Sequence, residues 1–123
     1  MDLATAPLTV STPAQVRAAH RKIRGFAKQI LDADTAYDVG LMACEAMSNA
    51  VLHGHGDVTV TVSCSERTLR VEVRDDGPAL LVVGRVDHGR GLTLIEALAA
   101  RWSLDRADDG TCLWFEVDRE AGQ

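Results

Sequence analysis

Four short segments of the chain carry residue types that can do chemistry, and the first is a pair of polar residues in an apolar stretch. Glu45 and Asn49 are four positions apart, so on a helix they share one face. A carboxylate on an apolar helix is costly unless it is paired, hydrated or close to a metal ion. Taken alone, the pair favours a structural glutamate at the edge of a cleft, and its interpretation depends on the segments downstream.

The second segment is Asp75-Asp76-Gly77, which follows a stretch of alternating apolar and polar residues. An aspartate at the end of a strand can accept a hydrogen bond from an exocyclic amine. A glycine two positions later lets a flat ring approach the backbone. Asp-Gly pairs are also common in simple turns, so this segment alone is compatible with either interpretation.

The third segment, Gly89-Arg90-Gly91-Leu92, stands before a short apolar helix. The first amides of a helix are unpaired and its dipole is positive there, and glycines let a phosphate approach them. The segment follows a loop and lacks the third glycine of a dinucleotide-binding fingerprint, and the chain has no P-loop lysine motif. Taken alone, the third segment indicates a flexible loop and a helix cap.

The fourth segment, Gly110-Thr111, begins the last strand and alone indicates only a hairpin.

The elements that must position these segments follow from hydrophobic spacing and from turn residues. Thr12-Pro13 is typical of a helix start. We expect helices at about residues 13–30, 34–53 and 91–101, and strands at 58–62, 69–73, 102–106 and 111–117, with an extra strand possible at 8–11. Helices and strands are partly segregated along the chain. This order predicts an α+β fold, a two-layer sandwich in which helices cover one face of a mostly antiparallel mixed sheet.

The chain is expected to form one domain over residues 1–123. Its length of 123 residues suits one domain, with a core at about 12–118 and frayed tails at 1–7 and 119–123. The net charge of -5 argues against direct nucleic-acid binding, and no apolar run is long enough to span a membrane. There is no signal-peptide pattern. Cys44, Cys64 and Cys112 fit no zinc spacing, so we interpret them as small core residues of a cytoplasmic protein.

The four segments, taken in order, resemble the GHKL ATPases. The closer likeness is to the small bacterial anti-sigma-factor serine kinases, and it lies in residues 45–54, 71–78 and 89–92 within a resemblance that covers 16–117. The resemblance implies the Bergerat ATP-binding fold, with ATP and Mg²⁺ as ligands. It also implies that Asn49 gives its amide oxygen to Mg²⁺ and that Asp75 accepts a hydrogen bond from the adenine amine.

The resemblance implies roles for the remaining residues as well. Gly77 would admit the adenine, and Thr111 would support Asp75 through its hydroxyl group and a water molecule. The glycine segment would cradle the phosphates, with Arg90 or Arg85 in contact with them; its members are Gly89, Arg90, Gly91 and Leu92. Glu45 would orient or deprotonate the attacking hydroxyl group.

The function that the resemblance implies is that of an ATP-binding anti-sigma factor. Such a protein phosphorylates a serine or threonine of an anti-sigma antagonist in partner-switching control of transcription. Its partners would be a sigma factor, the antagonist and a second copy of itself. The alternative is a non-catalytic partner-binding module of the same fold that binds ATP weakly or not at all. A histidine-kinase catalytic domain is disfavoured, because no dimerising helical pair with a phosphoacceptor histidine fits in the chain. Leu52 stands where many relatives carry a basic residue.

Two further groups of residues leave alternatives open. A basic stripe, defined as Arg17, Arg21, Arg24 and Lys28, recurs at helical spacing and is either a solvated face or a docking surface for an acidic partner. The three histidines His53, His55 and His88 invite a metal interpretation. No cysteine or acidic cluster completes such a site, so that interpretation is the weaker one.

Overall fold

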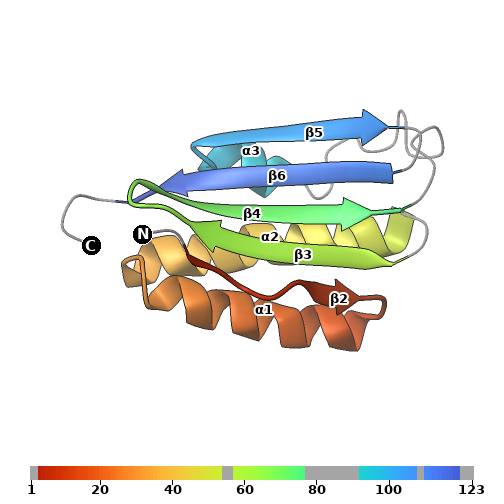
Figure 1. Cartoon of the computed structure of the whole chain (residues 1–123), viewed down its shortest axis with the longest axis horizontal. Helices are drawn as coiled ribbons and strands as arrows, with labels where there is room; N and C mark the ends of the chain where they lie inside the picture. Colours follow the sequence, from red (N-terminus) through yellow and green to blue (C-terminus); the bar gives the residue numbers. More distant parts are fainter. Residues whose placement is uncertain (1–2, 54–56, 77–91, 108–109, 120–123) are drawn as a thin grey trace.

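In the computed structural model, residues 3–53, 57–76, 92–107 and 110–119 are described, and a six-stranded sheet lies in front of three helices in Figure 1. The helices are α1 (Pro13–Lys28), α2 (Ala33–His53) and α3 (Thr93–Leu98). The strands are β1 (Leu3–Ala4), β2 (Leu8–Val10), β3 (Val58–Cys64), β4 (Thr68–Asp75), β5 (Arg101–Ala107) and β6 (Gly110–Asp118). The predicted α+β two-layer sandwich is confirmed, since the helices lie on one side of the sheet.

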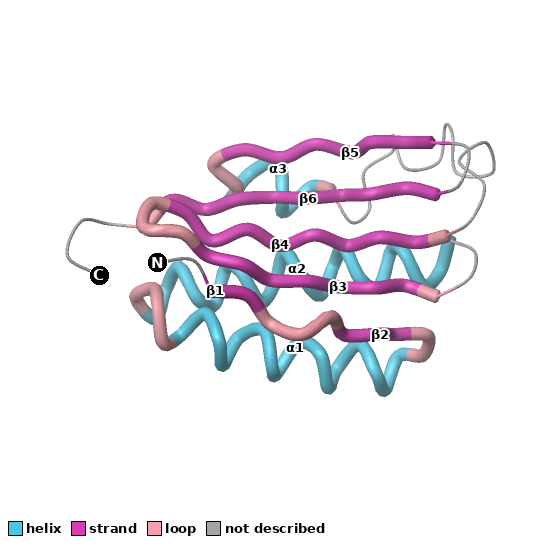
Figure 2. The backbone as a smooth tube through the Cα atoms, viewed as in Figure 1, coloured by secondary structure: helices cyan, strands magenta, loops and turns pink. Residues whose placement is uncertain are grey.

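The strand order is β1-β3-β4-β6-β5, and β2 also pairs with β3, beyond β1 along the same edge (Figure 2). Every pairing in the described part of the chain is antiparallel, so the expectation of a mixed sheet is wrong there. The neighbours β4 and β6 are far apart in sequence, with α3 and β5 between them. This crossover brings the end of β4 next to the start of β6.

The N-terminal segment is more ordered than the sequence suggests. Leu3 and Ala4 pair with the end of β3, and the backbone N–H of Thr5 donates to the carbonyl oxygen of Val62 at 2.8 Å. The Thr5 hydroxyl accepts from the Val62 N–H at 3.2 Å. These bonds continue the sheet into a stretch that we expected to be frayed. They also satisfy backbone groups at the edge of β3.

Helix α1 begins where its sequence predicts and packs closely on α2. The Thr12 hydroxyl accepts from the backbone N–H of Gln15 at 3.2 Å, which caps the helix, and Pro13 occupies its first turn. Gly40 of α2 is buried, and a Cβ added to it would lie 2.9 Å from Nε2 of His20. The absence of a side chain at Gly40 therefore allows the two helices to approach at this point.

Side chains alternate strictly along the central strands. On β4, Leu69, Val71 and Val73 are buried under the helices, and the residues between them face the other way. The same alternation places Cys112 on the open face, with its Sγ atom 3.8 Å from Oε1 of Glu72. The interpretation of Cys112 as a core residue is wrong, although Cys64 is buried as expected.

Helix α3 is shorter than expected, because it ends at Leu98 and the chain enters the next strand at Arg101. Ala99 has extended backbone angles and β5 begins at Arg101. The backbone N–H of Ala100 donates to the carbonyl oxygen of Glu116 at 2.8 Å, so pairing with β6 takes over from the helix. None of the helices in the described ranges is long and apolar enough to cross a membrane.

Candidate functional site

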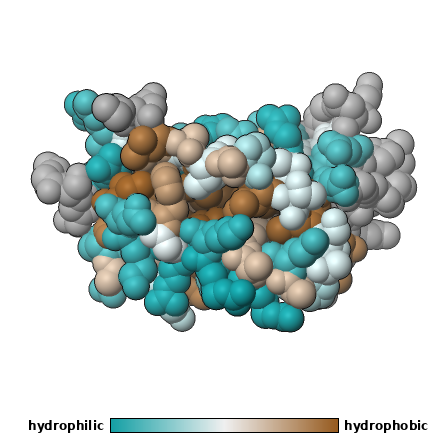
Figure 3. All heavy atoms as spheres, turned by 60° about the horizontal axis from the view of Figure 1, so that its bottom comes forward, coloured by the Kyte–Doolittle hydropathy of each residue, from teal (hydrophilic) through white to brown (hydrophobic). Residues whose placement is uncertain are grey.

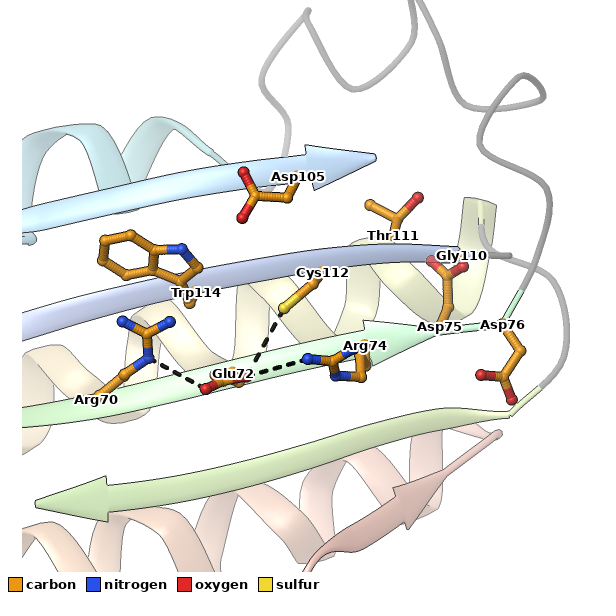
Figure 4. Close-up of a pocket in the computed structure, with 10 residues that line it drawn as sticks. All are labelled: Arg70, Glu72, Arg74, Asp75, Asp76, Asp105, Gly110, Thr111, Cys112 and Trp114. Atoms are coloured by element: carbon orange, nitrogen blue, oxygen red, sulfur yellow. Dashed lines mark hydrogen bonds and ion pairs between the residues drawn. The ribbon is translucent and has the colours of Figure 1, made fainter. Parts of the chain in front are cut away.

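Asp75 and Thr111 face each other at the ends of two neighbouring strands. They are direct register partners in the β4–β6 ladder. Each is only 9% exposed. Because side chains alternate along a strand, Asp75 and Thr111 lie on the same face of the sheet as Val73 and Leu113, the face that the helices cover. Figure 4 shows both side chains at this end of the sheet. Burying a carboxylate costs free energy unless the group forms hydrogen bonds. The buried position of Asp75 therefore fits a role as a specific hydrogen-bond acceptor.

The Thr111 hydroxyl is the second feature of this end of the sheet. Its Oγ1 atom is buried and has no hydrogen-bond partner among the described residues. A buried hydroxyl without a partner costs about 1–3 kcal/mol. A ligand or a water molecule that bridges to Asp75 would satisfy it. This orphan group fits the expected adenine-binding role of the pair.

Gly110 sets how closely β6 approaches Asp75. Its φ of +156° lies in a range that other residues rarely adopt, and a Cβ there would lie 2.2 Å from the Asp75 carbonyl oxygen. The same Cβ would lie 3.4 Å from Cα of Asp76. From the sequence we expected Gly110 only as part of a hairpin, and its close approach to the Asp75 carbonyl group was not predicted. The one sequence feature that could have indicated this approach is the presence of a glycine immediately before Thr111.

Gly110→Ala is expected to push the ends of β4 and β6 apart, because the added Cβ overlaps the Asp75 carbonyl group. We expect a lower melting temperature and severalfold weaker ATP binding, measured by thermal unfolding and titration calorimetry. Gly25→Ala is the matched control, since an added Cβ at Gly25 meets nothing within 4 Å. In a helix such as α1, alanine is favoured over glycine by about 0.5–1 kcal/mol, so the control should be slightly more stable. Unchanged stability and affinity in Gly110→Ala would contradict the close contact.

Helix α2 carries the other pair of candidate residues. One side of the helix is buried against the core, and the residues of that side are Ala36, Val39, Met42, Ala43, Ala46 and Met47. Glu45 and Asn49 are half-buried and one turn apart. In Figure 1 the C-terminal half of α2 lies behind the same end of the sheet at which β4 ends and β6 begins. The fold therefore brings the helix pair and the strand pair to one end of the molecule.

Asn49 fits a role as a magnesium ligand. Its amide oxygen is a hard donor, and Mg²⁺ in nucleotide sites is held by one or two protein oxygens together with phosphates and water. The described residues contain no group of three or more histidine, cysteine, aspartate or glutamate side chains that could hold a metal by themselves. A magnesium ion at this end would thus rely on Asn49, water and the nucleotide.

Several predicted site residues fall outside the described part of the chain. These are Gly77, Gly89, Arg90 and Gly91, together with Arg85 and with His55 and His88 of the metal interpretation. Leu92 is described: it is 4% exposed and precedes the first turn of α3. Leu92 is thus a core residue, and its contribution to a phosphate site would come from its backbone.

The basic stripe lies on the surface of α1. All four of its side chains are exposed, opposite the buried residues Val16, Ala19, Ile23 and Ala27. The guanidinium carbon of Arg24 stands 5.3 Å from the ring centroid of Tyr37, which is itself 49% exposed. Figure 3, turned so that this side comes forward, shows hydrophilic residues over α1 below a band of apolar ones. The stripe is accessible to a partner.

Comparison with known proteins places the chain in a wider context. Residues 9–117 match the family model of the histidine kinase-like ATPase domain. No curated protein matches the chain. Among solved structures, the fold is similar to that of the RsbU and RsbW domains of Rv1364c from Mycobacterium tuberculosis, with a TM-score of 0.70 and 22% identity. The match covers 95% of this chain and 34% of the other, and at this identity it establishes a shared fold.

Proposed function

The chain belongs to the histidine kinase-like ATPase domain family, and we propose that it is an anti-sigma factor that phosphorylates a serine or threonine of an anti-sigma antagonist. Family membership implies ATP binding. The finer proposal is supported by the ordered motifs, which resemble those of the small anti-sigma-factor kinases, and by the fold shared with a structure that contains an RsbW domain.

One observation carries the proposal of a nucleotide site. Asp75, a buried acceptor, stands directly across from the orphan hydroxyl of Thr111. The C-terminal half of α2, which carries Glu45 and Asn49, lies behind this end of the sheet. An adenine amine donates a hydrogen bond, whereas guanine presents an oxygen at the same position. A carboxylate therefore selects adenine.

The proposed reaction needs positioning and charge neutralisation more than covalent help from the protein. Mg²⁺ would neutralise charge on the transferring phosphate, held in part by Asn49. Glu45 would orient the incoming hydroxyl group and accept its proton as the oxygen attacks the γ-phosphorus. The bond to the β–γ bridging oxygen then breaks, and ADP is the leaving group. Each step uses residues that lie at this end of the fold.

The experiment that tests the function starts from the partners. A pull-down with the folded chain, repeated with and without Mg-ATP, would recover the sigma factor and the antagonist. Labelled ATP is then offered to the chain together with the recovered antagonist. We expect label on a serine or threonine of the antagonist. ATP binding without any transfer would overturn the kinase proposal and favour the partner-binding module.

The proposed partners include a second copy of the chain and an acidic surface that docks on the basic stripe. Replacing all four residues of the stripe, Arg17, Arg21, Arg24 and Lys28, by glutamine should weaken capture of that partner by about tenfold at low salt. Charge complementarity chiefly accelerates association and is screened by salt. Surface plasmon resonance at several ionic strengths measures the effect, and ATP affinity should be unchanged. Equal capture by both proteins at low salt would make the stripe a solvated face.

A further inference from the structure

Strand β2 lies at one edge of the sheet beside α1, and the proposed chemistry does not use this part of the chain (Figure 1). Among the described residues β2 pairs with β3 alone. Its outer side therefore carries backbone groups that no described strand satisfies. An edge of this kind is where an extended peptide can join a sheet as a further strand.

The register determines which backbone groups of β2 point outward. The N–H of Thr5 donates to the carbonyl oxygen of Val62 at 2.8 Å, and the N–H of Val62 donates to the Thr5 hydroxyl at 3.2 Å, so the backbone of Val62 faces this edge. The register partners of Leu8 and Val10 lie two and four residues before Val62, so they face the same way and exchange hydrogen bonds with β2. Thr9, between Leu8 and Val10, therefore directs its N–H and C=O away from the sheet.

Thr9 is the centre of this free edge, because the donor positions on either side of it are closed. Two residues later, the N–H of Ser11 donates to Oε1 of Gln15 at 2.7 Å. Two residues earlier, Pro7 has no N–H to donate. A peptide at this edge forms its central pair of main-chain hydrogen bonds with Thr9, and side chains must supply the remaining affinity and the specificity.

Beside this edge the surface is hollowed between β2 and α1 into a cavity of about 270 Å³, which we call the β2–α1 groove. Leu8 and Val10 line it on the β2 side, and Ala18 and Ala19 line it on the α1 side. The short alanine side chains leave room for an apolar group of a ligand. Figure 3, which brings this side forward, shows a band of apolar residues beside the hydrophilic surface of α1.

Lys22 also lines the groove, and it is exposed. It follows Arg21 of the basic stripe by one residue, which turns its side chain about 100° round the helix, away from the stripe. No ion pair to Lys22 is found within the part of the chain that the structure describes. Helix α1 contains no acidic residue and residues 3–12 contain no charged one, so the groove is complementary to a carboxylate.

We propose that the β2–α1 groove binds an extended, acidic peptide segment of another protein, which joins the sheet as a strand beside β2. Side chains alternate along such a strand, so those at every second position face the groove. One apolar side chain packs against Ala18 and Ala19, and a carboxylate two positions away pairs with Lys22. The recognised motif is thus an apolar and an acidic residue separated by one position. Neither ATP nor the basic stripe takes part, so failure of this proposal leaves the kinase proposal untouched.

A displayed library of random decapeptides is the probe that tests the motif. The wild-type chain should enrich peptides with an apolar and an acidic residue two positions apart. Lys22→Glu should instead enrich peptides with a basic residue in place of the acidic one, because the charge at the groove is reversed. Arg67→Glu is the control, since it makes the same charge change at the exposed β3–β4 turn, and it should select the wild-type motif.

Two substitutions of Thr9 test the addition of a strand. Thr9→Pro removes the outward N–H, whereas the hydrogen bonds from β2 to β3 remain, because proline is tolerated at a strand edge whose N–H faces solvent. The affinity for one synthetic peptide from the selection, measured by fluorescence anisotropy, should fall at least about tenfold. Thr9→Ala keeps the N–H and should bind this peptide like the wild type. Thermal unfolding checks that both variants are folded.

Amide chemical shifts locate the bound peptide, and the shifts of residues 8–10 and 15–22 should change most during a titration. The proposal is overturned if no motif is enriched, if Lys22→Glu enriches the wild-type motif, or if folded Thr9→Pro keeps the wild-type affinity. It is also overturned if the same shifts change when the chain alone is diluted, because a second copy then occupies the groove. Should Thr9→Pro fail to fold, the selection with Lys22→Glu and the chemical shifts decide the outcome.

Discussion

Asp75→Asn should weaken ATP binding at least about tenfold, a loss of at least about 1.4 kcal/mol, which is close to the lower end of the range for a hydrogen bond to a charged group. The carboxylate is 9% exposed and acts only as an acceptor, whereas an amide presents a donor as well. Titration calorimetry measures the affinity of the folded variant. Asp76→Asn is the matched control, because Asp76 is the next residue in the chain and is exposed, and its ATP affinity should not change.

Two further measurements separate a hydrogen bond at Asp75 from a general disturbance of the strand end. The wild-type chain should bind ATP more tightly than GTP, because guanine offers an oxygen in place of the amine. Thr111→Val should lower ATP affinity without lowering stability, since Oγ1 of Thr111 forms no hydrogen bond within the described residues. Equal affinities for ATP and GTP, or an Asp75→Asn variant that binds ATP like the wild type, would reject the adenine assignment.

The architecture could be predicted because each layer has its own pattern in the sequence. Helical spacing and the Thr12-Pro13 start predicted α1, and strict alternation over residues 58–62 and 69–73 predicted the centres of β3 and β4. The elements that the sequence did not predict correctly are those whose bounds depend on pairing between strands that are distant in the sequence. The two residues of β1 are too few to show a period, and the end of α3 is decided by hydrogen bonds to β6.

In the candidate site, too, the sequence predicted which residues matter but not which of them are neighbours across the sheet. The order of motifs singled out Asp75 and Thr111, but it could not show that they are register partners, because β4 and β6 pair across an intervening helix and strand. The contact of Gly110 with the Asp75 carbonyl group depends on the same pairing. Cys112 was misassigned because β6 has apolar residues on both faces, so alternation alone did not say which face is buried.

Glu45→Ala should leave ATP and partner binding largely intact and slow phosphoryl transfer to the antagonist by about 10²–10⁴, the usual contribution of a general base. The physical reason is the proposed role of Glu45, which is half-buried on α2 one turn before Asn49, as the base that accepts the proton of the incoming hydroxyl group. Single-turnover transfer of labelled phosphate measures the rate. Glu45→Gln keeps the shape of the side chain and removes the base, so it should be slowed nearly as much as Glu45→Ala.

Asn49→Ala is the companion variant, and its defect should be of a different kind. Losing the amide oxygen should weaken ATP binding in the presence of Mg²⁺ and have little effect when the metal is chelated, since the oxygen acts only through the ion. Glu45→Ala should show the reverse: normal magnesium-dependent binding and a slow chemical step. Calorimetry with and without a chelator, run beside the transfer assay, separates the two residues. If Glu45→Ala transferred phosphate at the wild-type rate, the carboxylate would be structural, and the edge-of-cleft interpretation of this residue would stand.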